Sequence, residues 1–168
     1  PLTPTFVELC KGYFNVTPLE VGAGTRTGIK IDYDSPRDVG ADRVVDAAAA
    51  ILLYGGPAVV VDIGTATVFD AVTEDGSYLG GAIAPGIQIA ADSLFHTTAQ
   101  LRRVELYPPP AAIGKNTIHA LQSGLVYGFA EMVKGMVGRF DRELVGESKV
   151  IGTGGHVKVV ADEVEIFD

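Results

Sequence analysis

The chain has 168 residues, a formal net charge of −8 and a hydrophobic content of 47%. This length predicts a domain that buries a core, and the acidic balance argues against nucleic-acid binding through a basic surface. The most apolar stretch, residues 47–61, is too short to span a bilayer, so we expect no membrane partner. A single cysteine, Cys10, excludes an internal disulfide and fits a reducing compartment, which predicts a cytoplasmic protein.

The amino-terminal quarter of the chain predicts one helix and two short strands. It begins at Pro1 instead of Met, and we therefore expect a fragment or a processed piece of a longer protein. Apolar residues at helical spacing predict a helix over residues 5–14. Residues 18–22 are predicted to be a short strand, and residues 28–31 an edge strand.

A second helix is predicted over residues 42–54, and the Gly55-Gly56-Pro57 sequence ends it. From spacing alone we interpret Asp42 as the cap of this helix, worth about 1 kcal/mol. Asp46 shares a helix face with Asp42, and such a like-charge pair costs a few tenths of a kcal/mol unless something offsets it.

Residues 58–86 are predicted to form a three-stranded antiparallel meander whose apolar first strand is buried on both faces. Asp62 ends that strand, and Gly64 and Thr65 form a tight corner. Thr65 and Thr67 could offer N–H and O–H donors to an oxyanion. A negative Asp62 at the same place makes sense only with a cation between them, which suggests a phosphate-plus-metal site. An ordinary hairpin with an Asx-turn remains the alternative.

The rest of the chain alternates helices with glycine-rich or proline-rich connections. A helix is predicted over residues 86–99, and three prolines at 108–110 form a rigid connector. A long helix is predicted from the 114–117 motif to about Leu144. Its Gly124 and Gly128 would let another backbone pack closely. A strand over 148–151 leads into a Gly turn at 152–155 that could face a nucleotide, and a helix follows over 157–164.

Five short motifs in this order and spacing resemble those of type III pantothenate kinases, over nearly the whole chain. They are Gly40-Ala41-Asp42-Arg43, the 62–67 and 80–86 segments, the 114–117 segment and Thr153-Gly154-Gly155. The resemblance implies an α/β fold of the ribonuclease-H-like, actin-like ATPase kind, with a mixed sheet flanked by helices and two similar domains in the full protein. Residues 1–40 would then be the tail of the first domain and residues 41–56 an interdomain helix. Residues 57–168 would be the second domain, incomplete at its end.

The resemblance also assigns roles to individual residues. Asp42 would accept the proton of the pantothenate hydroxyl, and Arg43 is suited to the pantothenate carboxylate. The other implied substrate contacts are Tyr33, Gly40, Ala41 and Thr117. Asp62 would hold a monovalent cation, potassium or ammonium, and magnesium would arrive with ATP. The implied nucleotide contacts are Gly64, Thr65 and Gly154. The family works as a homodimer whose substrate pocket borrows from both subunits.

The chain departs from the family pattern at three places. The amino-terminal phosphate loop does not occur in these 168 residues, nor do the final strand and helix, so we expect the 168 residues alone not to turn over ATP. Val68 stands where a second Thr is often found, which removes one hydroxyl.

The function expected from this resemblance is ATP-dependent phosphorylation of pantothenate to 4'-phosphopantothenate, the first step of coenzyme A biosynthesis. Two alternatives remain: a non-enzymatic accessory protein of the same fold, and a kinase of another small hydroxy acid. Tyr33, Asp42, Arg43 and Thr117 together favour pantothenate.

Overall fold

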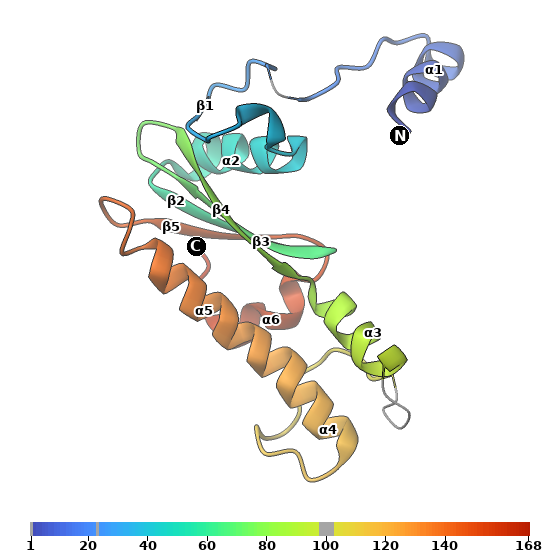
Figure 1. Cartoon of the computed structure of the whole chain (residues 1–168), viewed down its shortest axis with the longest axis vertical. Helices are drawn as coiled ribbons and strands as arrows, with labels where there is room; N and C mark the ends of the chain where they lie inside the picture. The colour runs from blue at the N-terminus through green and yellow to red at the C-terminus, as the bar shows by residue number, and fades with distance from the viewer. Residues whose placement is uncertain (1, 23, 98–102) are drawn as a thin grey trace.

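The computed structural model describes residues 2–22, 24–97 and 103–168 of the chain. These residues form one five-stranded mixed sheet with helices packed on both of its faces (Figure 1). The elements, in chain order, are α1 (Thr3–Phe14), β1 (Lys30–Ile31), η1 (Pro36–Asp38), α2 (Ala41–Tyr54), β2 (Ala58–Ile63), β3 (Ala66–Val72), β4 (Ser77–Pro85), α3 (Ile87–Thr97), α4 (Thr117–Gln122), η2 (Ser123–Tyr127), α5 (Gly128–Phe140), β5 (Lys149–Thr153) and α6 (Val157–Val164).

The sheet has the strand order β1-β4-β3-β2-β5. Strands β2, β3 and β4 pair antiparallel, which confirms the predicted meander. Strand β5 runs parallel to β2, and the short β1 runs parallel to the start of β4. The mixed sheet with flanking helices confirms the α/β class.

Alternation along β2 divides its side chains between two helical layers. Val59, Val61 and Ile63 belong to the main core, which α5, α6 and η2 complete. Val60 faces α2, where it packs with Ala50. Asp62 follows the same alternation as Val60, so its carboxylate lies on the α2 face of the sheet. Figure 1 shows α2 lying over that face.

Helix α2 forms where small apolar residues recur at helical spacing. These residues lie on one side of the helix and pack against the sheet. Val44, Ala47 and Ala50 are buried, whereas the opposite side of the helix is exposed. The helix ends at Tyr54, because Gly55 follows with a φ of 81°, a conformation that glycine adopts without strain. The predicted end of this helix is confirmed.

Two predictions about secondary structure are wrong. Residues 18–22 form no strand, and no neighbouring strand lies beside them to supply hydrogen bonds. The long helix begins at Thr117 and ends at Phe140, and the π-helical turn η2 interrupts it. No atom of the described residues beyond the helix's own backbone lies within 4 Å of an added Cβ at Gly124 or Gly128, so the close packing of another backbone there stays a prediction for a second chain. The expected end of α3 near residue 99 lies outside the described residues.

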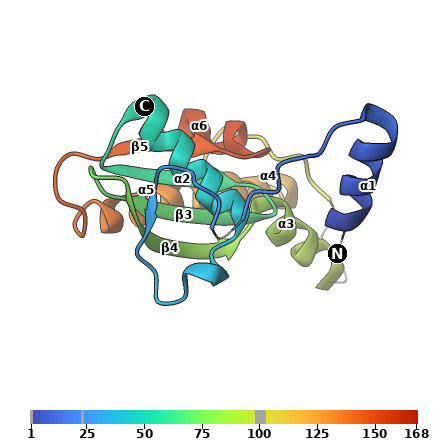
Figure 2. The same cartoon turned by 90° about the horizontal axis from the view of Figure 1, so that it is seen from above.

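Helix α1 stands apart from the sheet, as Figures 1 and 2 both show, and none of its residues is buried. Within the described parts of the chain, we find no helix with the length and hydropathy that a membrane crossing requires.

Candidate functional site

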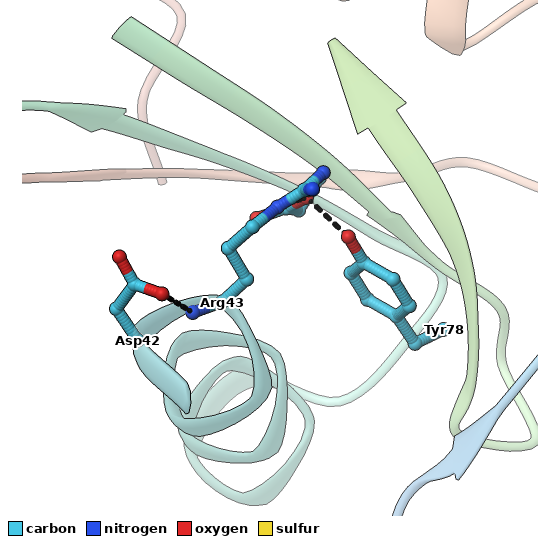
Figure 3. Close-up of polar contacts among 4 residues, drawn as sticks. Asp42, Arg43 and Tyr78 are labelled. Atoms are coloured by element: carbon cyan, nitrogen blue, oxygen red, sulfur yellow. Dashed lines mark hydrogen bonds and ion pairs between the residues drawn. The ribbon is translucent and has the colours of Figure 1, made fainter. Parts of the chain in front are cut away.

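A buried carboxylate, Asp70 on β3, organises the α2 face of the sheet. The Arg43 guanidinium donates to Asp70 Oδ1 through Nε at 3.0 Å and through Nη2 at 2.6 Å. The Tyr78 hydroxyl donates to the same oxygen at 2.8 Å, and Figure 3 shows this hydroxyl and the Arg43 guanidinium converging. Burial raises the pKa of Asp70, whereas the hydrogen bonds from Arg43 and Tyr78 lower it. The hydrogen bonds from the Arg43 guanidinium therefore keep the charged Asp70 side chain in place beneath the start of α2.

Two tyrosines frame Arg43. Tyr78 is fully buried, and burial together with the charge of Asp70 raises its pKa far above the ordinary value, so its hydroxyl remains a donor. The guanidinium carbon of Arg43 lies 5.6 Å from the centre of the Tyr78 ring, and the Tyr33 ring lies 6.2 Å from the same ring. A Cβ at Gly80 would lie 3.0 Å from Tyr33 Cε2, so glycine makes room for this ring. Tyr33 and Arg43, two predicted substrate contacts, therefore lie together.

Asp42 lies in the first turn of α2, and its side chain is exposed. The helix cap is Gly40, so the interpretation of Asp42 as the cap is wrong. Instead, Asp42 Oδ1 accepts a hydrogen bond from the Arg43 backbone N–H at 2.9 Å, and the helix dipole favours its charge. A Cβ at Gly40 would collide with Asp42 Oδ1, so glycine at position 40 gives this carboxylate its space. Ala41 begins the helix between them.

Asp62 and Asp46 bring further negative charge to the same region. Burial raises the pKa of Asp62, and the charges of Asp42 and Asp70 add to the effect. Burial likewise raises the pKa of Asp46, followed by the charges of Asp62, Asp42 and Asp70. The four carboxylates therefore lie near enough to act on one another's pKa, with Arg43 paired to one of them. Such a site favours a bound cation.

The Gly64-Thr65 corner at the end of β2 is enclosed by two glycine-containing segments. Gly86 N–H donates to the Thr65 carbonyl at 3.1 Å. Gly154 has a φ of 96°, and a Cβ there would collide with Asp62 Oδ1 and lie 2.6 Å from the Ile63 carbonyl. The turn after β5 therefore packs against the corner, which brings the predicted nucleotide contacts Gly64, Thr65 and Gly154 together beside Asp62.

Thr67 does not face this site, and its predicted role as a hydroxyl donor to an oxyanion is wrong. It pairs with Ile63 across the hairpin and is fully buried, and its Oγ1 has no hydrogen-bond partner in the described parts of the chain. Val68, which pairs with Asp62, lies on the site face. Alternation along β3 separates the two side chains.

Thr117 is the one predicted substrate contact that lies apart from the others within the chain. It is exposed and begins α4, whose cap is Asn116; the Asn116 side chain accepts a hydrogen bond from His119 N–H at 2.9 Å. Figure 1 places α4 and α2 at opposite ends of the molecule.

The metal chemistry of the site is limited by its ligands. Among the described residues, no three His, Cys, Asp or Glu side chains converge in a way that could hold a metal ion. Asp62 can therefore contribute one carboxylate to a cation, and other ligands would have to come from elsewhere. This fits a cation that is bound loosely and exchanges with the medium better than a fully protein-bound one.

Taken together, the geometry defines a mixed α/β domain with a carboxylate-rich, glycine-lined site at one end of its sheet. Comparison with known sequences places this domain in a family. The family model described as type III pantothenate kinase matches residues 1–139, and the chain belongs to that family.

Curated relatives agree with this assignment. The chain is 49% identical over 168 residues to a type III pantothenate kinase of Dehalococcoides mccartyi, which covers all of the chain and 64% of the relative. It is 51% identical over 165 residues to the type III pantothenate kinase of a Roseiflexus species, covering 98% of the chain and 65% of the relative. The chain thus spans about two thirds of the length of the curated relatives it matches.

A solved structure supports the fold. A Campylobacter jejuni protein, described as a Baf family transcriptional activator, matches with a TM-score of 0.53 and 26% sequence identity. The match covers 80% of this chain and 57% of that one.

Proposed function

We propose that the protein of which this chain forms part phosphorylates pantothenate with ATP to give 4'-phosphopantothenate, the first step of coenzyme A biosynthesis, in the cytoplasm. The observation that carries this proposal is the pairing of an exposed Asp42 with an Arg43 held by Asp70, next to a Tyr33 ring. A carboxylate free to take a proton and a guanidinium suited to a carboxylate are what a hydroxy acid substrate needs.

On the substrate side, Asp42 accepts the proton of the pantothenate hydroxyl. The oxygen of that hydroxyl forms a bond to the γ-phosphorus of ATP, and the bond to the leaving ADP breaks. Arg43 binds the carboxylate of pantothenate. Its bonds to Asp70 use Nε and Nη2, which leaves the Nη1 donors outside that pair. Gly40 and Ala41 keep the backbone close to the substrate, and Tyr33 covers it.

On the nucleotide side, Gly64, Thr65 and Gly154 hold the ATP phosphates by close approach of the backbone. Asp62 holds a monovalent cation, potassium or ammonium, and magnesium accompanies ATP. The raised pKa of Asp62 supports this, because a cation relieves the repulsion from Asp42 and Asp70. The cations neutralise charge that develops on the transferred phosphoryl group.

Thr117 reaches pantothenate from the second subunit of a homodimer. The support for this is that α4 leads into η2 and α5, which pack on the face of the sheet opposite α2 (Figure 1). The finer fold proposal is a ribonuclease-H-like, actin-like ATPase arrangement. In this arrangement α2 connects two similar domains across the nucleotide site.

The test is a coupled ATP assay of the full-length protein with and without pantothenate. We expect ADP release to depend on pantothenate and to saturate with it. ADP release that is the same in its absence would overturn the proposal. In that case, another small hydroxy acid that restores turnover would identify a different kinase, and none that does would favour an accessory protein.

A further inference from the structure

The segment that leads into α4, described over residues 103–116, contains no helix or strand. We name it the connector. Packing against the core and side-chain hydrogen bonds hold it in place. Val104 and Leu106 pack against the main core, and Pro109 is buried. Glu105 and Tyr107 alternate with them and are exposed. The connector therefore follows one defined path over the surface of the core.

Three side chains at the start of the long helix bind the connector backbone. Each donates a hydrogen bond to a carbonyl oxygen, and the three carbonyls are spread over eight residues. The bonds are Gln122 Nε2 to Glu105 O at 3.0 Å, Tyr127 hydroxyl to Pro109 O at 2.6 Å and Ser123 Oγ to Ala112 O at 2.6 Å.

The connector's sequence explains why side chains, and not the backbone of a neighbouring strand, supply the hydrogen bonds to its carbonyl groups. Three consecutive prolines at 108–110 have no N–H groups, so this part of the chain cannot pair as a strand. Ser123 and Tyr127 are also the first and last residues of the π-helical turn η2. Such turns are rare and are frequently found at functional sites.

The end of the connector lies directly on the first turn of α4. A Cβ at Gly114 would collide with the Ala120 backbone nitrogen and lie 2.6 Å from the His119 carbonyl carbon. Two residues later Asn116 caps the helix, and Thr117 begins it. A shift of the connector is therefore transmitted to the position of Thr117.

We propose that Tyr127 and Ser123 are positioning residues that act through the connector to fix Thr117 for substrate binding. The proposal rests on the proposed function, in which Thr117 contacts pantothenate. When either bond is lost, the connector occupies a wider range of positions, and the Thr117 hydroxyl meets the substrate less often. The hydrogen bonds of both side chains go to the connector and not to the Gly64-Thr65 corner, so we expect the nucleotide side to be unaffected.

The experiment uses the full-length protein with Tyr127→Phe and Ser123→Ala. We expect the KM for pantothenate to rise about three- to tenfold, the value of one hydrogen bond, with kcat and the KM for ATP within twofold of the wild type. Tyr107→Phe is the matched control, because it also removes one tyrosine hydroxyl. Tyr107 lies in the connector itself, and its side chain is 52% exposed. The control should leave all three constants unchanged.

A double-mutant cycle tests whether the effect passes through Thr117. In a Thr117→Ala background, Tyr127→Phe should change the KM for pantothenate by less than twofold. Hydrogen exchange of residues 105–112 should be faster in Tyr127→Phe than in Tyr107→Phe.

The outcomes separate this inference from the proposed function. The inference is overturned, and the proposed function stands, if wild-type turnover depends on pantothenate while Tyr127→Phe and Ser123→Ala leave the KM for pantothenate unchanged. If a variant raises the KM for pantothenate and the KM for ATP equally, the two residues have a general structural role and the inference is overturned. The same holds if Tyr127→Phe raises the KM for pantothenate as much in the Thr117→Ala background as in the wild type. Wild-type protein without pantothenate-dependent turnover overturns the proposed function itself.

Discussion

Tyr78→Phe removes one hydroxyl from the buried Asp70 carboxylate and leaves the ring packing in place. The bond is 2.8 Å long, and water cannot replace the hydroxyl because Tyr78 is fully buried and Asp70 is 2% exposed. A hydrogen bond to a charged group contributes about 1.5–3 kcal/mol. Since Arg43 still binds Asp70, we expect the free energy of unfolding to fall by about 2 kcal/mol. For a chain of this size, the melting temperature should fall by roughly 4–8 °C.

Urea and thermal unfolding at pH 7 measure this change, and Tyr54→Phe at the end of α2 is the control, because its side chain is 48% exposed. The hydrogen bond from Tyr78 lowers the pKa of Asp70, so it favours the ionised carboxylate. The difference between wild type and Tyr78→Phe should therefore shrink as the pH falls through the pKa of Asp70. Equal losses in Tyr78→Phe and Tyr54→Phe, at any pH, would refute the reasoning.

Three further predictions concern the acidic residues of the site in the full-length protein. Asp42→Asn should lower kcat by ~10²–10⁴ and shift the melting temperature by less than about 2 °C, because Gly40 is the cap; a loss of less than about threefold would contradict the role of base. Exchange of potassium for sodium at constant ionic strength and saturating magnesium should remove most turnover, and Asp62→Asn should abolish the difference; equal wild-type rates in both salts would contradict the cation site. Burial and the charge of Asp62 raise the pKa of Asp46 above its value in the unfolded chain, so its ionisation destabilises the fold as the pH rises. Asp46→Asn should raise the melting temperature by about 1–2 °C at pH 8, and the gain should vanish below about pH 4; a gain equal to that of exposed Asp162→Asn would argue against this.

Local patterns in the sequence were sufficient for the elements that depend on local chemistry. The meander follows from strand alternation between a tight Gly64-Thr65 corner and an Asp-Gly turn, and α2 from small apolar residues ended by Gly55. The failures concern elements that packing decides. Residues 18–22 have strand-like composition but no neighbouring strand. The π-helical turn η2 has no sequence signature, because it is stabilised by contacts with the connector.

The site was predicted in part, and the register of the hairpin explains the part that was missed. Asp62 and the corner were recognised, but the Asp70–Tyr78 pair was not. In the structure three residues, 64–66, lie between the paired Ile63 and Thr67, so Asp62 pairs with Val68, and Asp70 lies two residues further along the same face. A two-residue corner at Gly64-Thr65 would instead pair Asp62 with Thr67, so the predicted corner does not place Thr67 on the opposite face, where the structure has it. The position of Thr117 could not be found in this way, since it depends on how the connector folds.

The charges of the site explain why cations belong to the proposed reaction. Asp42, Asp46, Asp62 and Asp70 repel one another, and Arg43 already binds Asp70 through two N–H groups. ATP and pantothenate both bring further negative charge. Two like charges about 4 Å apart repel by roughly 4 kcal/mol at an effective dielectric constant near 20. One guanidinium does not offset this charge, so we expect binding of both substrates to draw positive charge from the medium. Burial, followed by the charges of Asp42 and Asp70, raises the pKa of Asp62. A cation at Asp62 would offset these effects, and we therefore expect turnover to depend on it even when magnesium saturates the nucleotide.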